Sequence, residues 1–593
     1  MSLTAVMLAA ALLASAQTSP AHPARHSADP WWNHAVFYEI YPRSFQDSNG
    51  DGVGDLNGIT QRLDYVQSLG VNALWITPFY PSPQVDFGYD ISDYENIDPQ
   101  YGTLADFDRL LAAAKKRDLR VVMDMVLNHT SDQHAWFKQS RGSRKNPKRD
   151  WYVWRDGKRG ADGKMHPPNN WQSLFGHSAW QWDAKTRQYY YHRFYAEQPD
   201  LNWRNPAVEQ AMFAQMRFWL DRGVAGFRLD AIDSLLEDPT LADAPANLDA
   251  KGQPKVNPFG EVELKQDLQV NQPGLHAIVK QLRAMVESYP GDRVLIGETY
   301  MPNIHELDKW YGGAKRDEVQ LPMDTQIGLV KENGLHAEKW RAAIEQAETQ
   351  LHGEPLLVMD NHDNPRMDRF CTPEFGAAAT GDDCIRLEKM LATLLFATRD
   401  AALMYYGDEI GMQTTPPTRR EDVKDPIGIL GWPKEKGRDG ERTPMQWTPA
   451  KDAGFSTADH TWLPIPPNYV TANVQIETAD RNSMLNYYKS LLALRNSAPA
   501  FTHAPERMIT TSNDADILAL ARGTGAIVLC NFSSQPQTFA VSDSTLPRGS
   551  ALRVTLANYD FGPSELKSSG ITLPPFGAVV AQAAPETIPT PAP

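Results

Sequence analysis

The stretch Arg120-Val121-Val122-Met123-Asp124-Met125-Val126 is apolar at almost every position and runs directly into Leu127-Asn128-His129. A strand that helices cover on both faces has this composition, because neither face meets water. Further short runs rich in apolar and β-branched residues occur at 36–41, 71–76, 226–229, 294–296, 356–359 and 402–405. Buried runs of this kind are typical of the strands of a parallel sheet.

Helical patterns separate these runs. Thr103 and Asp106 form a capping box, and apolar residues then follow on one helical face as far as Ala114. A second amphipathic helix is predicted from Pro206 onward. Repeated strand–helix units predict the α/β class, and the length suits a (β/α)8 TIM barrel with insertions.

The alternation breaks in two places. Residues 129–202 are rich in Trp, Gly, Pro and Asn, and the stretch is too long for a plain loop. After 503, the runs 516–522 and 526–532 indicate a hairpin in an all-β region. We therefore predict four parts: a barrel over 31–128 and 203–503, an inserted subdomain after the third strand over 129–202, a C-terminal β-sandwich over 504–581 and a loose tail over 582–593.

The first residues resemble an export signal. Ala5 to Ala14 is an apolar run of the length of a signal-peptide core, and Ala14-Ser15-Ala16 suits a cleavage site. No Lys or Arg precedes Arg25, so a disordered or misassigned N-terminus is the alternative. We predict a signal peptide over 1–16 and a periplasmic or secreted protein with no membrane span, because no later segment has the ~18 apolar residues that a span needs.

Composition limits the class of partner. The 593 residues exceed the ~250–300 that one core supports, and 41% of them are apolar, which indicates a folded protein of several domains. Lys and Arg number 58 against 73 Asp and Glu, a formal net charge of −15. Such a surface argues against nucleic-acid binding and favours a small neutral or cationic substrate. The oligomeric state is not predicted.

Three cysteines occur, at 371, 384 and 530, and none has metal-type spacing. Cys371 and Cys384 flank a short polar loop, and an oxidising compartment would favour a bridge between them, with Cys530 free. Free buried thiols are the alternative.

Polar residues stand where several of the predicted strands end. Asn128-His129 ends the third, Arg228 and Asp230 end the fourth, Glu298 ends the fifth, and Asp360-Asn361-His362-Asp363 ends the seventh. A TIM barrel carries its chemistry at these carboxyl ends. Three carboxylates with two histidines and an arginine therefore predict an active site.

These blocks resemble, in order, the conserved regions of the α-amylase family of glycoside hydrolases. Gln198-Pro199-Asp200-Leu201-Asn202-Trp203 looks like the additional region of its α-glucosidase and oligo-1,6-glucosidase branch, and Arg442-Thr443-Pro444-Met445-Gln446-Trp447 supports the same branch. The resemblance extends from about Trp31 into the C-terminal β-region.

The resemblance implies a role for each polar residue. Asp230 is the nucleophile, Glu298 the general acid and then base, and Asp363 stabilises the oxocarbenium-like transition state. His129 and His362 donate hydrogen bonds to the same sugar. Arg228 lies two residues before Asp230, on the same strand face, so its guanidinium is expected to keep Asp230 ionised. Glu298 needs a raised pKa, which burial and the charge of Asp230 can supply.

Three further residues are assigned by the resemblance to the glucose end of the pocket. Asp90 would grip the terminal glucose, Tyr89 would stack on its ring, and Arg442 would clamp the same sugar. If Asp90 and Arg442 close the pocket, cleavage removes one glucose at a time from the non-reducing end.

The loop Asp47-Ser48-Asn49-Gly50-Asp51-Gly52-Val53-Gly54-Asp55 has oxygen ligands spaced like the first half of an EF-hand, but Gly58 replaces the bidentate Glu at position 12. The loop resembles the calcium site of oligo-1,6-glucosidases. We therefore predict a structural Ca²⁺ site, with Mg²⁺ as the alternative, built from the side chains of Asp47, Asn49, Asp51 and Asp55 and the carbonyl of Val53.

The predicted function is a retaining, exo-acting α-glucosidase. The alternatives are an oligo-1,6-glucosidase, a trehalose synthase or other transglycosylase, and a non-catalytic partner of a membrane transporter. Ala231 follows the nucleophile, at a position where the resemblance associates Val with α-1,6 preference. Ala therefore predicts a preference for α-1,4 bonds.

Overall fold

The structure is a computed structural model that describes residues 29–329, 334–398, 400–539, 552–561, 565–566 and 570–583. The predicted signal segment 1–16 and residues 584–593 of the predicted tail lie outside these ranges. Over the described ranges, no helix combines the length and the apolar character needed to cross a membrane.

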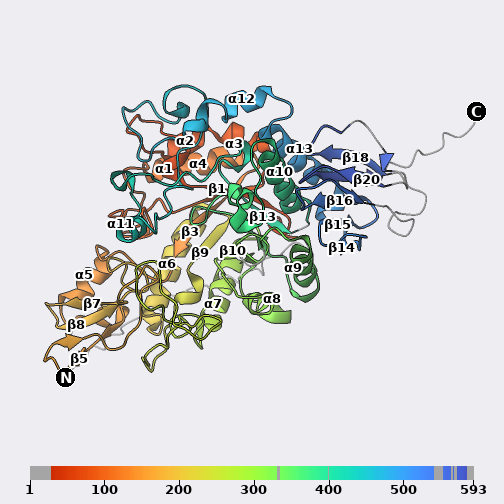
Figure 1. Ribbon diagram of the computed structural model, residues 1–593. Coiled ribbons are helices and arrows are strands. Elements are labelled where there is room, and N and C mark those ends of the chain that lie inside the picture. The colour runs from red at the N-terminus through yellow and green to blue at the C-terminus, as the bar shows by residue number, and fades with distance from the viewer. Residues whose placement is uncertain are drawn as a thin grey trace, which may run out of the picture.

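Eight parallel strands close into a barrel in the centre of the molecule (Figure 1), which confirms the predicted TIM-barrel class. Around the barrel the order is β1-β13-β12-β11-β10-β9-β3-β2. The strands are β1 Val36–Ile40, β2 Ala73–Ile76, β3 Arg120–Val126, β9 Gly226–Asp230, β10 Val294–Gly297, β11 Leu321–Asp324, β12 Leu356–Leu357 and β13 Ala401–Tyr405.

Seven of these strands coincide with the apolar runs of the sequence, and β11 was missed. It has only four residues, and Pro322 stands second among them. Proline cannot donate to a sheet ladder and normally argues against an internal strand. Here the hydrogen bonds to neighbouring strands are few, because β11 pairs with β10 and with β12 over two residues each.

The two faces of the barrel strands are buried in two different clusters of apolar side chains. In β1, Phe37 points into the barrel, where it packs in a small cluster with Trp75, Val122 and Ile296. Its neighbour Val36 belongs to the large cluster between the strands and the outer helices. Side chains alternate across a strand, so a strand with apolar packing on both sides is apolar throughout.

The helices mostly surround the barrel. The capping box of Thr103 and Asp106 starts α4, as predicted. The helices are α1 Pro42–Phe45, α2 Leu56–Gln61, α3 Leu63–Leu69, α4 Leu104–Lys115, α5 Ala135–Gly142, α6 Pro206–Arg222, α7 Leu275–Glu287, α8 Ile304–Asp308, α9 Ala337–Gln350, α10 Asp382–Ala397, α11 Pro426–Gly431, α12 Val474–Ala479, α13 Met484–Ser497 and α14 Pro499–Thr502.

Two groups of antiparallel strands accompany the barrel (Figure 1). Between β3 and β9 lie the three-stranded sheet β4-β8-β7 (Trp154–Arg155, Gln188–Tyr191, Trp180–Asp183) and the pair β5 and β6 (Lys158–Arg159, Met165–His166). The C-terminal region holds the sheet β14-β15-β16-β21-β18-β19 (Glu506–Met508, Ile517–Arg522, Ala526–Asn531, Ala578–Ala583, Leu552–Ala557, Glu565–Leu566) and the pair β17 and β20 (Gln537–Phe539, Ile571–Leu573). The predicted domain limits themselves remain predictions.

Cys371 and Cys384 form the predicted disulfide, with Cα atoms 5.5 Å apart. Cys530 is free and buried in β16. Cys371 ends the short 3-10 helix η6, Met367–Cys371, and Cys384 lies in the first turn of α10.

Candidate active site

A cavity of about 630 Å³ opens at the carboxyl ends of the barrel strands. This volume is in the range of small-molecule sites. Asp230 enters it from the last residue of β9, Glu298 from the residue after β10, and Asp363 from the loop after β12. The structure therefore brings together the three carboxylates that the sequence placed at strand ends.

Arg228 does not line the cavity, but it contacts the carboxylates of Asp230 and Glu298, which do. On neighbouring strands, Arg228 and Asp124 are register partners, and Arg228 Nη1 donates to Asp124 Oδ1 at 3.0 Å. The same nitrogen donates to Asp230 Oδ1 at 2.7 Å, from two residues along β9. Nη2 lies 2.7 Å from Glu298 Oε1, although its N–H groups do not point at that oxygen. The fully buried guanidinium of Arg228 therefore forms ion pairs with three carboxylates.

Arg228 lowers the pKa of Asp230, which is the expected direction. Burial outweighs this attraction and raises the pKa of Asp230 to about 7. The charge of Asp124 acts in the same direction as burial, because two nearby carboxylates repel each other.

Glu298 has the raised pKa that a general acid needs. Burial is the main cause, and the charges of Asp230 and Asp363 add to it, so that the pKa of Glu298 rises to about 7 despite Arg228. Its Oε2 accepts the N–H of Ala231 at 2.6 Å. Two carboxyls that repel each other near neutral pH favour a state with one proton between them.

Asp363 has the opposite electrostatics. Burial would raise its pKa, but the charges of His362, Arg438 and Arg442 hold the pKa well below its usual range. Arg438 Nη1 and Arg442 Nη2 lie 2.9 Å and 2.6 Å from Asp363 Oδ1. Asp363 therefore stays ionised, as a group that stabilises positive charge must.

His362 is buried between acids. Its Nδ1 lies 2.6 Å from Glu39 Oε1, and its Nε2 lies 3.1 Å from Asp363 Oδ2. Although burial opposes the charged form, these two carboxylates raise the pKa of His362 to about 9. The ring of Tyr89 stacks on His362 with centroids 5.5 Å apart, and the Tyr89 hydroxyl donates to Asp124.

His129 lines the same cavity and is neutral, because burial lowers its pKa to about 3. Its Nε2 lies 3.1 Å from Gln198 Nε2, in the segment that resembles the α-glucosidase branch. Gln198 also donates to Asp86 Oδ2 at 3.1 Å.

Arg228 and His362, both predicted to contact the sugar, are fully buried and lie outside the cavity lining. Asp90 and Arg442, the two residues predicted to hold the terminal glucose, are corrected in the same way. Asp90 is fully buried in its own loop, where it accepts hydrogen bonds from Ser82 Oγ and the backbone N–H groups of Val85 and Asp86. Arg442 is also fully buried and is not part of the cavity lining. Its Nη2 forms an ion pair with Asp363, and its Nε donates a hydrogen bond to the carbonyl of His362.

The neighbours of these two residues occupy the cavity instead. Asp86 and Arg438 both line it and pair with each other at 2.8 Å, with side chains 6% and 13% exposed. Each lies four residues before the residue that was predicted. Sequence analysis missed both, together with Phe175, Phe194 and Tyr300 in the lining.

The predicted metal loop precedes α2. Asp47 accepts hydrogen bonds from the N–H groups of Asn49, Gly50 and Gly52 and from Ser456 Oγ. Asp55 caps α2 by accepting from Gly58 N–H. Asn49 and Asp51 are exposed. The donor set is all oxygen, which fits a hard cation such as Ca²⁺, and such an ion would share the oxygens of Asp47 with the loop amides.

Comparison with known proteins assigns the family. Residues 39–504 match the family described as alpha amylase, catalytic domain. The chain belongs to the α-amylase family. It is 39% identical over 93% of its length to a probable alpha-glucosidase of Rhizobium meliloti (strain 1021), of which it covers 97%. It is 37% identical over 90% of its length to an oligo-1,6-glucosidase of Parageobacillus thermoglucosidasius, of which it covers 96%.

A solved structure agrees with this assignment. The alpha-glucosyl transfer enzyme XgtA has a TM-score of 0.82 and 39% identity, with 94% of this chain and all of that chain covered. As a member of the α-amylase family, the protein is a glycoside hydrolase, which confirms the predicted enzyme class.

Proposed function

We propose that the protein is a retaining, exo-acting α-glucosidase that hydrolyses terminal non-reducing α-linked glucose, with α-1,4 bonds preferred. The observation that carries this proposal is the buried Asp86–Arg438 ion pair in the cavity lining, whose side chains are 6% and 13% exposed, whereas Tyr300 in the same lining is 45% exposed. We infer that the buried pair closes the cavity at one end. A closed end accommodates a terminal sugar and excludes the interior of a chain.

The chemistry follows from the three carboxylates. Asp230 attacks the anomeric carbon, and Glu298 gives its proton to the leaving oxygen. Esterified Asp230 no longer repels Glu298, so the pKa of Glu298 falls and its carboxylate can deprotonate the attacking water. Asp363, held ionised by two arginines, stabilises the positive charge that develops on the sugar.

The first test is the anomer released. Double displacement retains configuration, so an NMR time course with maltose is expected to show α-glucose before mutarotation. Release of β-glucose first would overturn the proposed mechanism. Maltose, isomaltose, sucrose and trehalose tested side by side separate hydrolysis from transfer, because a transferase yields new oligosaccharides in place of free glucose.

Linkage preference is expected to depend on Ala231. It lines the cavity beside Glu298, and its backbone is left-handed, with φ 42°. Val at this position is expected to shift the ratio of kcat/KM for maltose and isomaltose toward isomaltose by about ten- to a hundredfold, because an α-1,6 link can swing clear of a branched side chain.

Ala231→Thr is the matched control, since it brings the same branching and the same backbone strain. If the shape of the side chain at this position determines the linkage preference, Ala231→Thr is expected to shift the maltose-to-isomaltose ratio of kcat/KM as Ala231→Val does. A wild type that already prefers isomaltose would contradict the prediction and favour the oligo-1,6-glucosidase alternative.

We propose that the Asp47–Asp55 loop binds Ca²⁺ in a structural role. An ion bound only by the native state stabilises it by mass action, so EDTA is expected to lower the Tm and Ca²⁺ to restore it. Asp51→Ala is the informative variant, because Asp51 is exposed and caps no helix, whereas Asp55 caps α2. Wild type and Asp51→Ala that respond equally to EDTA would remove the site from this loop.

We propose that the protein is exported to the periplasm or beyond. The N-terminal apolar run supports this proposal, and so does the Cys371–Cys384 disulfide, because structural disulfides persist in oxidising compartments. Cell fractionation with an intact and a truncated N-terminus tests it.

A further inference from the structure

Two segments form one side of the cavity at its open end. Asn364 and Pro365 follow Asp363 directly, and Thr414 and Pro416 come from the loop after β13; all four line the cavity. Pro365 and Pro416 are exposed, and Asn364 Nδ2 lies 3.2 Å from the hydroxyl of the exposed Tyr300. These four residues, here called the mouth wall, therefore lie on the side of the leaving group.

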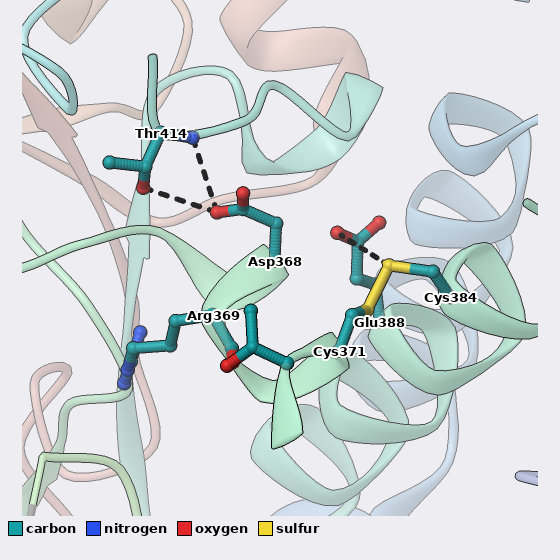
Figure 2. The surroundings of a disulfide bond; sticks show 7 residues. Asp368, Arg369, Cys371, Cys384, Glu388 and Thr414 are labelled. Atoms are coloured by element: carbon teal, nitrogen blue, oxygen red, sulfur yellow. Dashed lines mark hydrogen bonds between the residues drawn. A yellow bond between two sulfur atoms is a disulfide. The ribbon is translucent and has the colours of Figure 1, made fainter. Parts of the chain in front are cut away.

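The two segments of the mouth wall are joined through Thr414. Its hydroxyl accepts the backbone N–H of Arg366 at 2.8 Å. The Thr414 N–H and hydroxyl both donate to Asp368 Oδ1, each at 3.1 Å. Figure 2 shows Asp368 directed at Thr414 from η6. A change in the position of η6 would therefore move both segments.

The disulfide fixes the other end of η6. Cys371 is the last residue of η6, three residues after Asp368, and its partner Cys384 lies in α10 (Figure 2). Most of α10 is buried against the barrel, from Leu387 to Ala397. The bond therefore ties a short 3-10 helix to a rigid one, while Arg369 supplies a separate anchor by donating to backbone carbonyls.

A second cavity, of about 1160 Å³, lies behind this arrangement. Asp368, Cys371, Cys384 and Glu388 all line it, so the disulfide borders this cavity. Glu388 Oε1 lies 3.9 Å from Cys384 Sγ, but an oxidised sulfur has no hydrogen to donate. The carboxyl therefore gives the bond no hydrogen bond, and the covalent link adds to the apolar packing of α10 against η6.

We propose that the Cys371–Cys384 disulfide and Asp368 are positioning groups that hold the mouth wall and thereby set which leaving groups the enzyme accepts. This inference rests on the proposed α-glucosidase activity. Neither group touches the reacting sugar; both act through Thr414 and Asn364. Loss of either is expected to alter selection among leaving groups more than the hydrolysis of the glucosyl-enzyme, which every α-glucoside shares.

The test compares maltose, isomaltose and p-nitrophenyl α-glucoside, which share the glucosyl group. Asp368→Ala and the double variant Cys371→Ser with Cys384→Ser are each expected to change the maltose-to-isomaltose ratio of kcat/KM three- to tenfold. The kcat for p-nitrophenyl α-glucoside is expected to change less than twofold, because its later step does not involve the leaving group. Asp368→Asn keeps an oxygen acceptor for Thr414 and is expected to restore the wild-type ratio.

The reductant arm uses the wild type, so it does not depend on the variants folding. Dithiothreitol transfers two electrons and two protons, becomes a cyclic disulfide and leaves Cys371 and Cys384 as thiols. Reduced wild type is expected to show the same maltose-to-isomaltose ratio of kcat/KM as the double serine variant. Cys530→Ala, which removes the free thiol in β16, is expected to respond to dithiothreitol like wild type.

Two outcomes would contradict these expectations. Unchanged ratios of kcat/KM in Asp368→Ala and in the reduced enzyme, even with a lower Tm, would overturn the inference. A wild type that hydrolyses none of the three substrates would instead overturn the proposed function, and the inference with it.

Discussion

Replacing Asp230 by Asn is expected to remove nearly all turnover while the protein remains folded. The amide cannot form the glycosyl ester, and loss of a covalent nucleophile costs about 10⁴-fold or more in kcat. Steady-state rates with maltose and p-nitrophenyl α-glucoside measure the loss, and circular dichroism checks the fold. Burial raises the pKa of Asp230 to about 7, so replacing the carboxylate by a neutral amide is not expected to destabilise the fold.

Asp233→Asn is the matched control. Asp233 lies three residues further along, just after β9, and is absent from the lining of the active-site cavity. It is expected to keep wild-type turnover.

A second experiment uses azide to replace the missing nucleophile. In Asp230→Gly, azide is expected to attack the anomeric carbon from the side where the Asp230 carboxylate stood, and the product is expected to be β-glucosyl azide. An Asp230→Asn variant that keeps a tenth of the wild-type rate would assign the nucleophile to another residue.

The barrel was predictable because its strands are buried on both faces. The run at 120–126 is apolar at all positions except Arg120 and Asp124, and it matches β3 closely. The run at 226–229 matches β9 to within one residue. Pro322 concealed β11, since the sequence does not show that a four-residue barrel strand tolerates a missing donor. Burial alone does not reveal a strand in the sequence, because β11 is also buried at all four residues.

The catalytic carboxylates were predictable for a topological reason. The ends of parallel strands meet at one face of a barrel, so Asp230, Glu298 and Asp363 had to converge once their strands were placed. The closed end of the pocket was not predictable in this way. It is built by loops, and Phe87 and Gly88, with φ of 46° and 112°, reverse the chain between Asp86 and Asp90. That reversal points Asp86 into the cavity and Asp90 into its own loop.

The protonation of the site was predictable in part. A raised pKa of Glu298 follows from burial beside another acid. The pKa of Asp230 depends on how many carboxylates share Arg228, and Asp124 is brought beside it by the register of β3 against β9. The register between two strands is set only in the folded sheet. The sequence places Arg228 near Asp230, but it does not reveal that Asp124 and Glu298 contact the same guanidinium.

Glu298→Gln is expected to give the second large effect, a loss of about 10²- to 10⁴-fold in turnover of maltose. Gln cannot donate a proton to the leaving oxygen. p-Nitrophenol leaves without that proton, so formation of the glucosyl-enzyme from p-nitrophenyl α-glucoside is expected to survive and to appear as a burst. Equal losses with both substrates and no burst would argue that Glu298 is not the acid.

The same variant is expected to stabilise the fold above neutral pH. Burial raises the pKa of Glu298 from 4.5 to about 7, so the folded state binds this proton more tightly than the unfolded chain does. The free energy of unfolding therefore falls as the pH rises from about 4.5 to about 7, and above that the charged carboxylate costs about 3 kcal/mol. Glu298→Gln avoids this cost, so its Tm should exceed that of wild type at pH 8 and match it at pH 4, where both side chains are neutral. A lower Tm for Glu298→Gln at pH 8 would contradict this prediction. It would mean that the contact of the Glu298 carboxylate with Arg228 stabilises the fold by more than the burial of its charge destabilises it.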